Sequence, residues 1–93
     1  MAVVEREATV ANRLGIHARP AAELVKTAGR FRSDIRISKD GHWVNAKSIM
    51  GVMTLAAEWG SVVRVRADGN DAEDAVTAMV EVIERMWEEL LDE

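Results

Sequence analysis

The sequence contains no cysteine and no apolar run near the roughly 20 residues that a membrane-spanning helix needs. Without cysteine, neither disulfides nor thiolate metal sites can hold the fold together. Residues 1–5 show no basic segment followed by an apolar one, so a secretion signal is not indicated. Linkers, internal repeats and low-complexity stretches are also missing. These absences predict a single cytoplasmic domain over residues 1–93 that does not insert into a membrane.

The composition is that of an ordinary globular chain, because 48% of the residues are hydrophobic and 30% are charged. The net charge is −4, but basic residues concentrate in residues 13–47 and acidic residues in residues 81–93. A basic first half can favour acidic partners or phosphates, although a solvated charged surface explains the pattern more simply. Nucleic acid is a poor fit, since the chain is acidic overall and carries no recognition motif.

Alternation of apolar and polar residues predicts four strands, which cover residues 4–10, 33–38, 42–45 and 61–67. In the second strand Ile35 and Ile37 share one face, while the fourth strand alternates valines with arginines. The pair Asp40-Gly41 is a hairpin signal that joins the second strand to the third. Each strand is therefore expected to bury one face only.

Residues 18–28 form the clearest helical pattern, with apolar side chains at the i, i+3, i+4, i+7 spacing of an amphipathic helix. These residues are Ala21, Leu24, Val25 and Ala28. Pro20 falls in the first turn, where its missing N–H costs little. Gly29 then supplies a stop at the C-terminal end.

A second, short helix is expected to begin after Ser48, which is a residue type that caps helices. Its inward stripe is expected to comprise Ile49, Val52, Met53 and Ala56. Met50 falls off this stripe and is therefore expected to point outward. Gly60 ends the unit.

The last helix opens at residues 70–73, which resemble a capping box. Its apolar stripe comprises Val76, Met79, Val80, Ile83, Trp87 and Leu90. The predicted element order is therefore β-α-β-β-α-β-α. Strands with one buried face need helices on one side only. We expect an open-faced, two-layer α+β sandwich, a four-stranded antiparallel sheet with three helices on one face.

The residues around His17 make it the leading candidate for chemistry. A lone histidine in a loop is more often a surface residue, but His17 directly precedes the predicted helix 18–28. A helix N-terminus offers unpaired N–H groups and partial positive charge, which together hold an anion. Gly15 permits close approach, Ala18 leaves the site uncrowded, and Arg19 offers planar donors suited to phosphate. The helix end also favours the neutral, nucleophilic imidazole, so His17 is expected to carry a phosphoryl group.

Ser48 is the second candidate. As a helix N-cap it has a structural role, and an exposed capping hydroxyl is also a feasible phosphorylation site because the added charge faces a helix N-terminus. An outward Met50 near a reactive histidine suggests a docking surface. The alternative is that Ile49, Met50 and Met53 all belong to the core.

The remaining candidates have simpler explanations. His42 follows a turn and is expected on the surface, and no spacing of histidines and carboxylates resembles a metal site. The acidic run 88–93 is interpreted as a solvated helix end. Trp43, Trp59 and Trp87 are interpreted as packing residues rather than a base-stacking platform, because basic residues do not interleave with them. No cofactor is indicated.

Two motifs stand in order along the chain. The first is Gly15-Ile16-His17-Ala18-Arg19-Pro20-Ala21, and the second is Lys47-Ser48-Ile49-Met50-Gly51-Val52-Met53. They resemble the active-site signature and the regulatory-serine motif of the HPr family, the histidine-containing phosphocarrier proteins of the bacterial phosphoenolpyruvate-dependent phosphotransferase system. The resemblance extends from about Val4 to Leu90, nearly the whole chain.

The resemblance implies a phosphoryl carrier rather than an enzyme. Proteins of this family accept a phosphoryl group from a phosphohistidine on Enzyme I and pass it to a histidine on an EIIA component. By this resemblance His17 is phosphorylated on Nδ1 and Arg19 helps to bind the phosphoryl group. The backbone N–H groups of Ala18 and Arg19 would complete the phosphate cradle.

The resemblance also implies a regulated protein with a defined docking face, and nothing in the sequence pattern demands more than a monomer. Ser48 would be the target of HPr kinase/phosphorylase, an ATP-dependent regulator found in only part of the family. The implied partner-docking residues are Ala22, Lys26, Ile49, Met50 and Met53.

One departure from the family lies in residues 56–59, Ala-Ala-Glu-Trp, which replace a stretch that usually carries glycine near its start, so this loop is expected to differ in shape. Two alternatives stay open. The chain can be a phosphocarrier of a nitrogen-related regulatory branch, or a binding module controlled at Ser48 and not coupled to sugar uptake.

Overall fold

The computed structural model describes residues 2–11, 16 and 18–85, which form four strands and three helices in the expected order. The elements are β1 Val3–Thr9, α1 Ala18–Ala28, β2 Asp34–Lys39, β3 His42–Asn45, α2 Ile49–Thr54, β4 Val62–Asp68 and α3 Ala72–Glu84. Within these described ranges, no helix has both the length and the apolar character that a membrane span requires.

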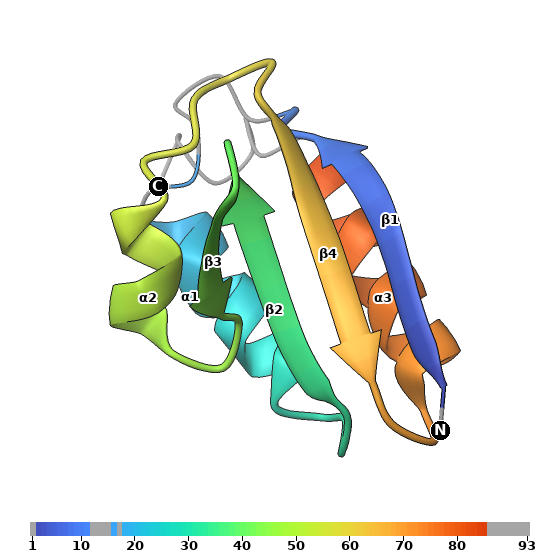
Figure 1. The fold of residues 1–93 in the computed structure, drawn as a ribbon. Helices are drawn as coiled ribbons and strands as arrows, with labels where there is room; N and C mark the ends of the chain where they lie inside the picture. The colour runs from blue at the N-terminus through green and yellow to red at the C-terminus, as the bar shows by residue number, and fades with distance from the viewer. Residues whose placement is uncertain (1, 12–15, 17, 86–93) are drawn as a thin grey trace.

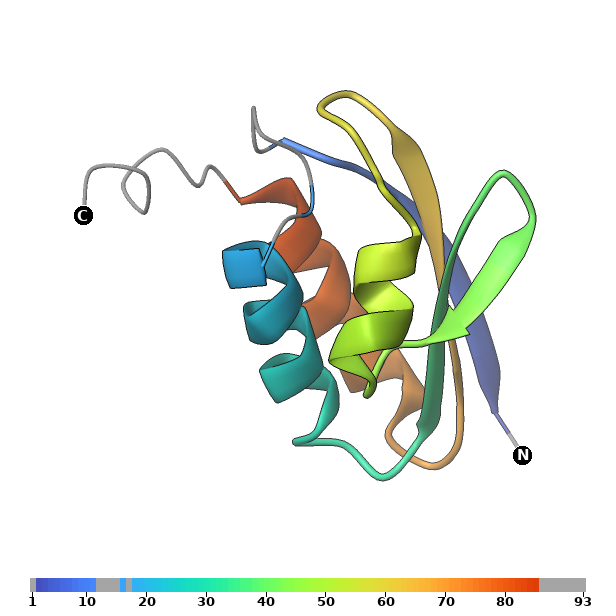
Figure 2. The ribbon, with the colours of Figure 1, turned by 90° about the vertical axis from the view of Figure 1, so that its left-hand side faces the viewer.

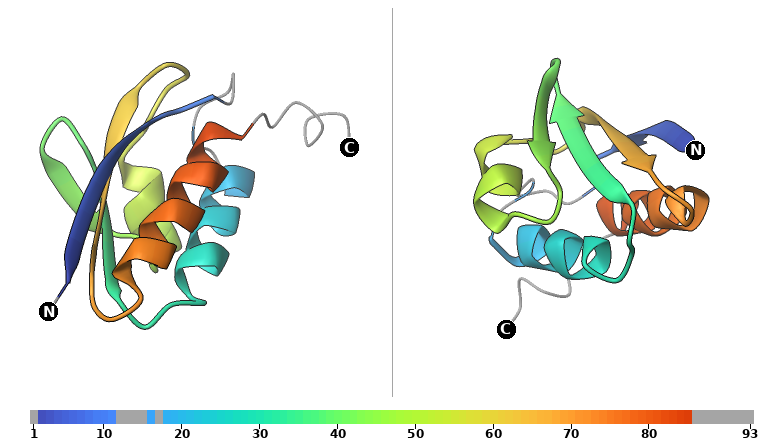
Figure 3. Two further views of the ribbon diagram at one scale, coloured as in Figure 1. Left: turned by 90° about the vertical axis from the view of Figure 1, so that its right-hand side faces the viewer. Right: turned by 60° about the horizontal axis from the view of Figure 1, so that its bottom comes forward.

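The strands form one antiparallel sheet in the order β1-β4-β2-β3. In Figure 1 the strands lie in front of α1 and α3, and the edge-on views in Figure 2 and Figure 3 place all three helices on the same side of the sheet. The other face of the sheet is uncovered. The predicted open-faced α+β sandwich is therefore confirmed.

The core lies between the sheet and the helices, and it follows the predicted alternation. In β2, Ile35 and Ile37 are completely buried, and β4 alternates buried and exposed positions along its length. The helices contribute the buried Leu24 of α1 and Met79 of α3. At roughly 25 cal/mol per Å² of apolar surface, this burial is the main force that holds helices and sheet together. Trp87 and Leu90, which were assigned to the stripe of the last helix, lie outside the described residues.

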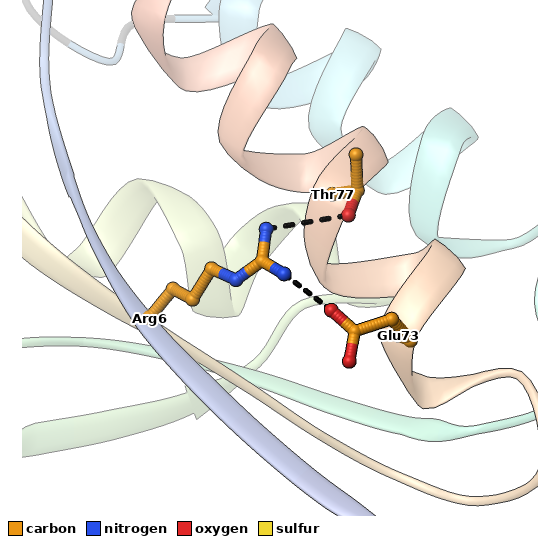
Figure 4. Close-up of polar contacts among 3 residues, drawn as sticks. All are labelled: Arg6, Glu73 and Thr77. Atoms are coloured by element: carbon orange, nitrogen blue, oxygen red, sulfur yellow. Dashed lines mark hydrogen bonds and ion pairs between the residues drawn. The ribbon is translucent and has the colours of Figure 1, made fainter.

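Arg6 connects β1 to α3, as Figure 4 shows. Its Nη1 donates a hydrogen bond of 3.3 Å to Thr77 Oγ1, and its Nη2 forms an ion pair with Glu73. All three side chains are exposed to solvent, so these contacts contribute little to stability compared with the apolar core beside them.

The predicted capping box of the last helix is wrong. The N-cap is Asp71, and its side chain makes no hydrogen bond to its own helix. Its carboxylate instead accepts hydrogen bonds from the backbone N–H of Arg32 at 2.8 Å, from the backbone N–H of Ser33 at 2.9 Å, and from the Ser33 hydroxyl. These bonds stabilise the charged form, led by the Ser33 hydroxyl, and lower the pKa of Asp71. The carboxylate of Asp71 therefore binds residues that are distant in sequence instead of the N–H groups of its own helix.

The predicted inward stripe of α2 is also wrong at three positions. Only Val52 is buried within this helix, while Ile49 is 40% exposed and Met53 is 42% exposed. Leu55, the C-cap three residues after Val52, is also buried, so the inward side of this unit follows Val52 and Leu55 rather than Ile49 and Met53. Ala56 lies beyond the helix end at Thr54 and is exposed.

Two tryptophans are not the packing residues that the sequence pattern indicated. Trp59 is 64% exposed and Trp43 is 36% exposed, whereas Trp87 lies outside the described residues. Trp59 falls in the connection between α2 and β4, and Trp43 points to the uncovered face of the sheet, so neither can reach the core. The C-terminal stop of α1 falls at Gly29 as predicted, but Gly29 does not adopt a positive φ.

Candidate functional site

The N-terminus of α1 is the centre of the candidate site. The helix begins at Ala18, directly after His17, and its first turn contains no acidic residue that would neutralise the positive helix end. Arg19 is exposed in this first turn, and Pro20 is buried. Gly15, His17 and the side chain of Ala18 lie outside the described part of the structure. The structure thus places the helix end and Arg19 where an anion can approach them.

The chain on both sides of residues 12–15 is hydrogen-bonded to one loop, residues 57–61. On one side, the N–H of Val10 donates to the carbonyl oxygen of Ser61 at 2.9 Å, and Gly60 donates to Val10 at 2.9 Å. On the other side, the N–H of Ile16 donates to Ala57 at 2.8 Å. These bonds fix the positions from which the chain enters and leaves the segment that precedes α1.

Ile16 is a positioning residue that the sequence analysis did not single out. Its side chain is only 8% exposed, so it anchors the chain in the core immediately before His17. The sequence signal for this role is an apolar residue just before a helix start. Such a residue commonly packs against the helix and fixes the direction in which the chain enters it.

Ser48 caps α2, as predicted. Its backbone is extended, and its Oγ accepts a hydrogen bond of 3.1 Å from the N–H of Gly51. The residue is half-buried. Asn45 prepares this turn, because its side-chain oxygen accepts from the N–H of Lys47 and its carbonyl oxygen accepts from the N–H of Ser48. The hydroxyl is therefore held at a helix N-terminus by a defined local structure.

The apolar residues of α2 form an exposed surface rather than part of the core. Met50 is 71% exposed, more than Ile49 or Met53. Helix α2 packs beside α1, on which Ala22 and Lys26 are also exposed (Figure 2). We call these five residues the helix-face patch. Exposed methionines on one surface are typical of a flexible protein-binding area.

The connection after α2 contains an alanine, Ala56, in a backbone conformation that favours glycine. Ala56 has a φ of 49°, in the left-handed region that L-residues adopt at a cost of about 1–2 kcal/mol. Its carbonyl oxygen accepts a hydrogen bond of 3.2 Å from Lys39 Nζ, which helps to fix this backbone. The departure in sequence is therefore accommodated as local backbone strain.

His42 is exposed at the start of β3, in agreement with the sequence interpretation. Among the described residues, no group of three or more histidine, aspartate or glutamate side chains is placed to hold a metal ion.

The described residues thus form an open-faced α+β sandwich, with no acidic residue in the first turn of α1 and with exposed apolar side chains on the neighbouring α2. The model of the family described as PTS HPr component phosphorylation site matches residues 4–85. The chain belongs to this family, the HPr phosphocarriers of the phosphotransferase system.

Individual relatives agree with this assignment. The chain is 51% identical to the phosphocarrier protein HPr of Xylella fastidiosa (strain Temecula1) over 87 residues, which cover 94% of this chain and 98% of that protein. The structure of HPr from Bacillus anthracis is 46% identical, with a TM-score of 0.85, and the match covers 89% of this chain and 99% of that chain. The catabolite repression protein Crh of Bacillus subtilis, solved as a dimer with a swapped domain, is 44% identical with a TM-score of 0.72, over 77% of this chain and 83% of that chain.

Proposed function

We propose that this single domain, residues 1–93, accepts a phosphoryl group on Nδ1 of His17 from phospho-Enzyme I and passes it to EIIA components. The observation that carries the proposal is the start of α1 directly after His17, with no acidic residue in the first turn. Membership of a family described by its phosphorylation site supports the same residue. The protein acts as a relay and not as an enzyme with turnover on a small molecule.

The chemistry asks little of the protein beyond positioning. In the first transfer, the P–N bond of the Enzyme I phosphohistidine breaks as a new P–N bond forms at His17. In the second, the P–N bond at His17 breaks as a new one forms at the EIIA histidine. Both steps pass through a loose, in-line transition state. The charge on the phosphoryl oxygens needs stabilisation, which the N–H groups of Ala18 and Arg19 and the guanidinium of Arg19 would supply. Because the phosphoryl group must also leave, this binding has to be moderate.

The helix-face patch is the proposed docking surface for Enzyme I and the EIIA components. Its exposed side chains on α1 and α2 offer apolar area, with the ammonium of Lys26 at the edge. A small, apolar and reversible interface suits a carrier that must exchange partners rapidly. Monomeric protein would leave this surface accessible, and gel filtration tests that state against the dimer described for Crh.

Phosphorylation of Ser48 is the proposed control. The residue before Ile49 and Met50 would gain about −1.5 to −2 charge beside the docking surface, which weakens docking of an apolar partner face. The added phosphate would face the N-terminus of α2, where backbone N–H groups stabilise it. HPr kinase/phosphorylase is the proposed modifying partner.

Labelling with phosphoenolpyruvate and Enzyme I tests the carrier role. Wild-type protein should gain an acid-labile phosphoryl group, and His17→Ala should gain none. His42→Ala is the matched control, because His42 is an exposed histidine on another element. Labelling that persists in His17→Ala overturns the assignment.

The two alternatives predict different labelling. A binding module controlled at Ser48, for which the relationship to Crh is the supporting observation, would be phosphorylated by ATP and the kinase but not by Enzyme I. A nitrogen-branch carrier would be labelled at His17 and would transfer to an EIIA that serves no sugar permease.

A further inference from the structure

The uncovered face of the sheet contains a depression of about 380 Å³ that lies outside the helix-face patch. Its lining residues are Glu7, Ser38, Asp40, Gly41, Trp43, Val62 and Arg64. This face is the one seen in front of the helices in Figure 1. The proposed phosphoryl transfer uses none of these residues.

Four of the lining residues form one row across the sheet. In the strand register Trp43 of β3 lies opposite Ser38 of β2, and Ser38 lies opposite Arg64 of β4. Arg64 in turn lies opposite Glu7 of β1. Residues directly opposite one another on a sheet face are about 4.5–5.5 Å apart at Cβ. The row therefore places an indole, a hydroxyl, a guanidinium and a carboxylate side by side.

Ser38 is the unusual member of this row. It is only 3% exposed, although it belongs to the face that no helix covers. Within the described part of the chain, its hydroxyl forms no hydrogen bond. Buried polar groups are almost always hydrogen-bonded, and an unsatisfied one is costly. A hydroxyl in this state at the wall of a depression is available to hydrogen-bond a molecule that binds there.

The charges around the depression restrict the chemistry of that molecule. Arg64 is paired with Glu5 at 3.2 Å and with Glu7 at 3.4 Å, and Asp40 adds another carboxylate. These carboxylates would repel an anion, and the guanidinium would repel a cation. A neutral molecule with several hydroxyl groups can use the donors and the acceptors together, and its apolar face can lie against the indole of Trp43.

We infer that this depression binds a neutral, polyhydroxylated ring of the size of one or two pyranose units. Its volume lies in the range of small-molecule sites, 300–1,000 Å³. Ser38 and Arg64 donate to ring hydroxyls, Glu7 and Asp40 accept from them, and Trp43 stacks on the ring. Because the site is shallow and the ligand small, we expect a Kd on the order of millimolar.

Nuclear magnetic resonance of the ¹⁵N-labelled full chain tests this inference with methyl β-D-glucopyranoside as the probe. Titration to roughly 50 mM should saturate a millimolar site and shift the amides of Ser38 and Arg64 and the indole N–H of Trp43. Glucosamine and glucuronate have the same ring with one positive or one negative charge, and they should bind at least about 5-fold more weakly. The absence of shifts, shifts confined to the helices, or tighter binding of a charged ring overturns the inference.

Substitutions locate the binding on this row. Trp43→Ala should weaken binding about 10-fold or more, whereas Trp59→Ala, at an exposed tryptophan in the connection between α2 and β4, should leave it unchanged. Ser38→Ala keeps the fold, because its hydroxyl has no partner to lose, and should weaken binding roughly 2- to 10-fold. It therefore provides the test if Trp43→Ala does not fold. Equal binding by Ser38→Ala and wild type overturns the role of the hydroxyl.

Discussion

Substitution of Gly69 by alanine should destabilise the fold more than a change at any other glycine with a positive φ in the described chain. Gly69 connects β4 to α3 and has a φ of 156°. A Cβ at this position would lie 2.5 Å from Ser33 Oγ and 2.8 Å from Ser33 Cα. Ser33 is buried and bonded to Asp71, so it cannot move away without the loss of those hydrogen bonds.

Two costs add up in this variant. A side chain in a backbone conformation that favours glycine costs on the order of 1–3 kcal/mol. Forcing an extra methyl group against backbone atoms costs about 1–3 kcal/mol more. The expected loss is therefore about 2–6 kcal/mol, a large share of the roughly 5–15 kcal/mol that stabilises a domain.

Equilibrium unfolding in urea measures this loss. Gly69→Ala should lower the midpoint with an unchanged m value. Gly41→Ala is the matched control, because Gly41 has a φ of 82° and its Cβ would meet nothing within 4 Å. That variant should lose only the conformational cost, about 1 kcal/mol. If both variants lose the same free energy, the contact with Ser33 is not the cause and the reasoning fails.

Four further predictions follow from the same structure. Ala56→Gly should raise the free energy of unfolding by up to about 1 kcal/mol in urea titrations, because it relieves a positive φ; a loss of stability would contradict the strain. Ser48→Ala should cost about 0.5–2 kcal/mol through the lost cap, whereas Ser48→Asp should keep the cap; equal losses in both would exclude capping. The lowered pKa of Asp71 means that its contribution is present above the ordinary value of 3.8 and disappears as the pH falls through the folded-state value, so Asp71→Asn should remove that part of the acid dependence seen in unfolding curves. Met50→Glu should slow phosphoryl transfer from Enzyme I about 10-fold in a labelling time course while stability stays within about 0.5 kcal/mol; unchanged transfer would remove Met50 from the docking surface.

The sheet and two of the helices were predictable because their residues repeat a pattern over many positions. In β4 every second side chain is buried, Ile35 and Ile37 of β2 follow the same alternation, and α1 covers the predicted residues from Ala18 to Ala28. Repeated burial of one face leaves a strong signal, since a shift by one residue would expose the whole apolar set.

Features set by a single contact were not predictable from the sequence. Asp71 has the residue type of a helix cap, but the neighbouring Ser33 lies far away in sequence and captures its carboxylate. Helix α2 is too short for its apolar residues to show which of them point inward. Arg19, Ser48 and the helix-face patch lie at positions consistent with their predicted roles. Their roles, and that of His17, stay predictions.

The hydrogen bonds between Ser33 and Asp71 join the connection before β2 to the connection between β4 and α3, at the opposite end of the sheet from the N-terminus of α1 (Figure 1). The two sites lie at opposite ends of the sheet and have no residue in common. The changes in unfolding free energy caused by substitutions at one end should therefore add to those at the other. Variation at the proposed docking end can then alter which proteins are recognised while the distant end preserves foldability. This separation allows relatives with one architecture to acquire different partners.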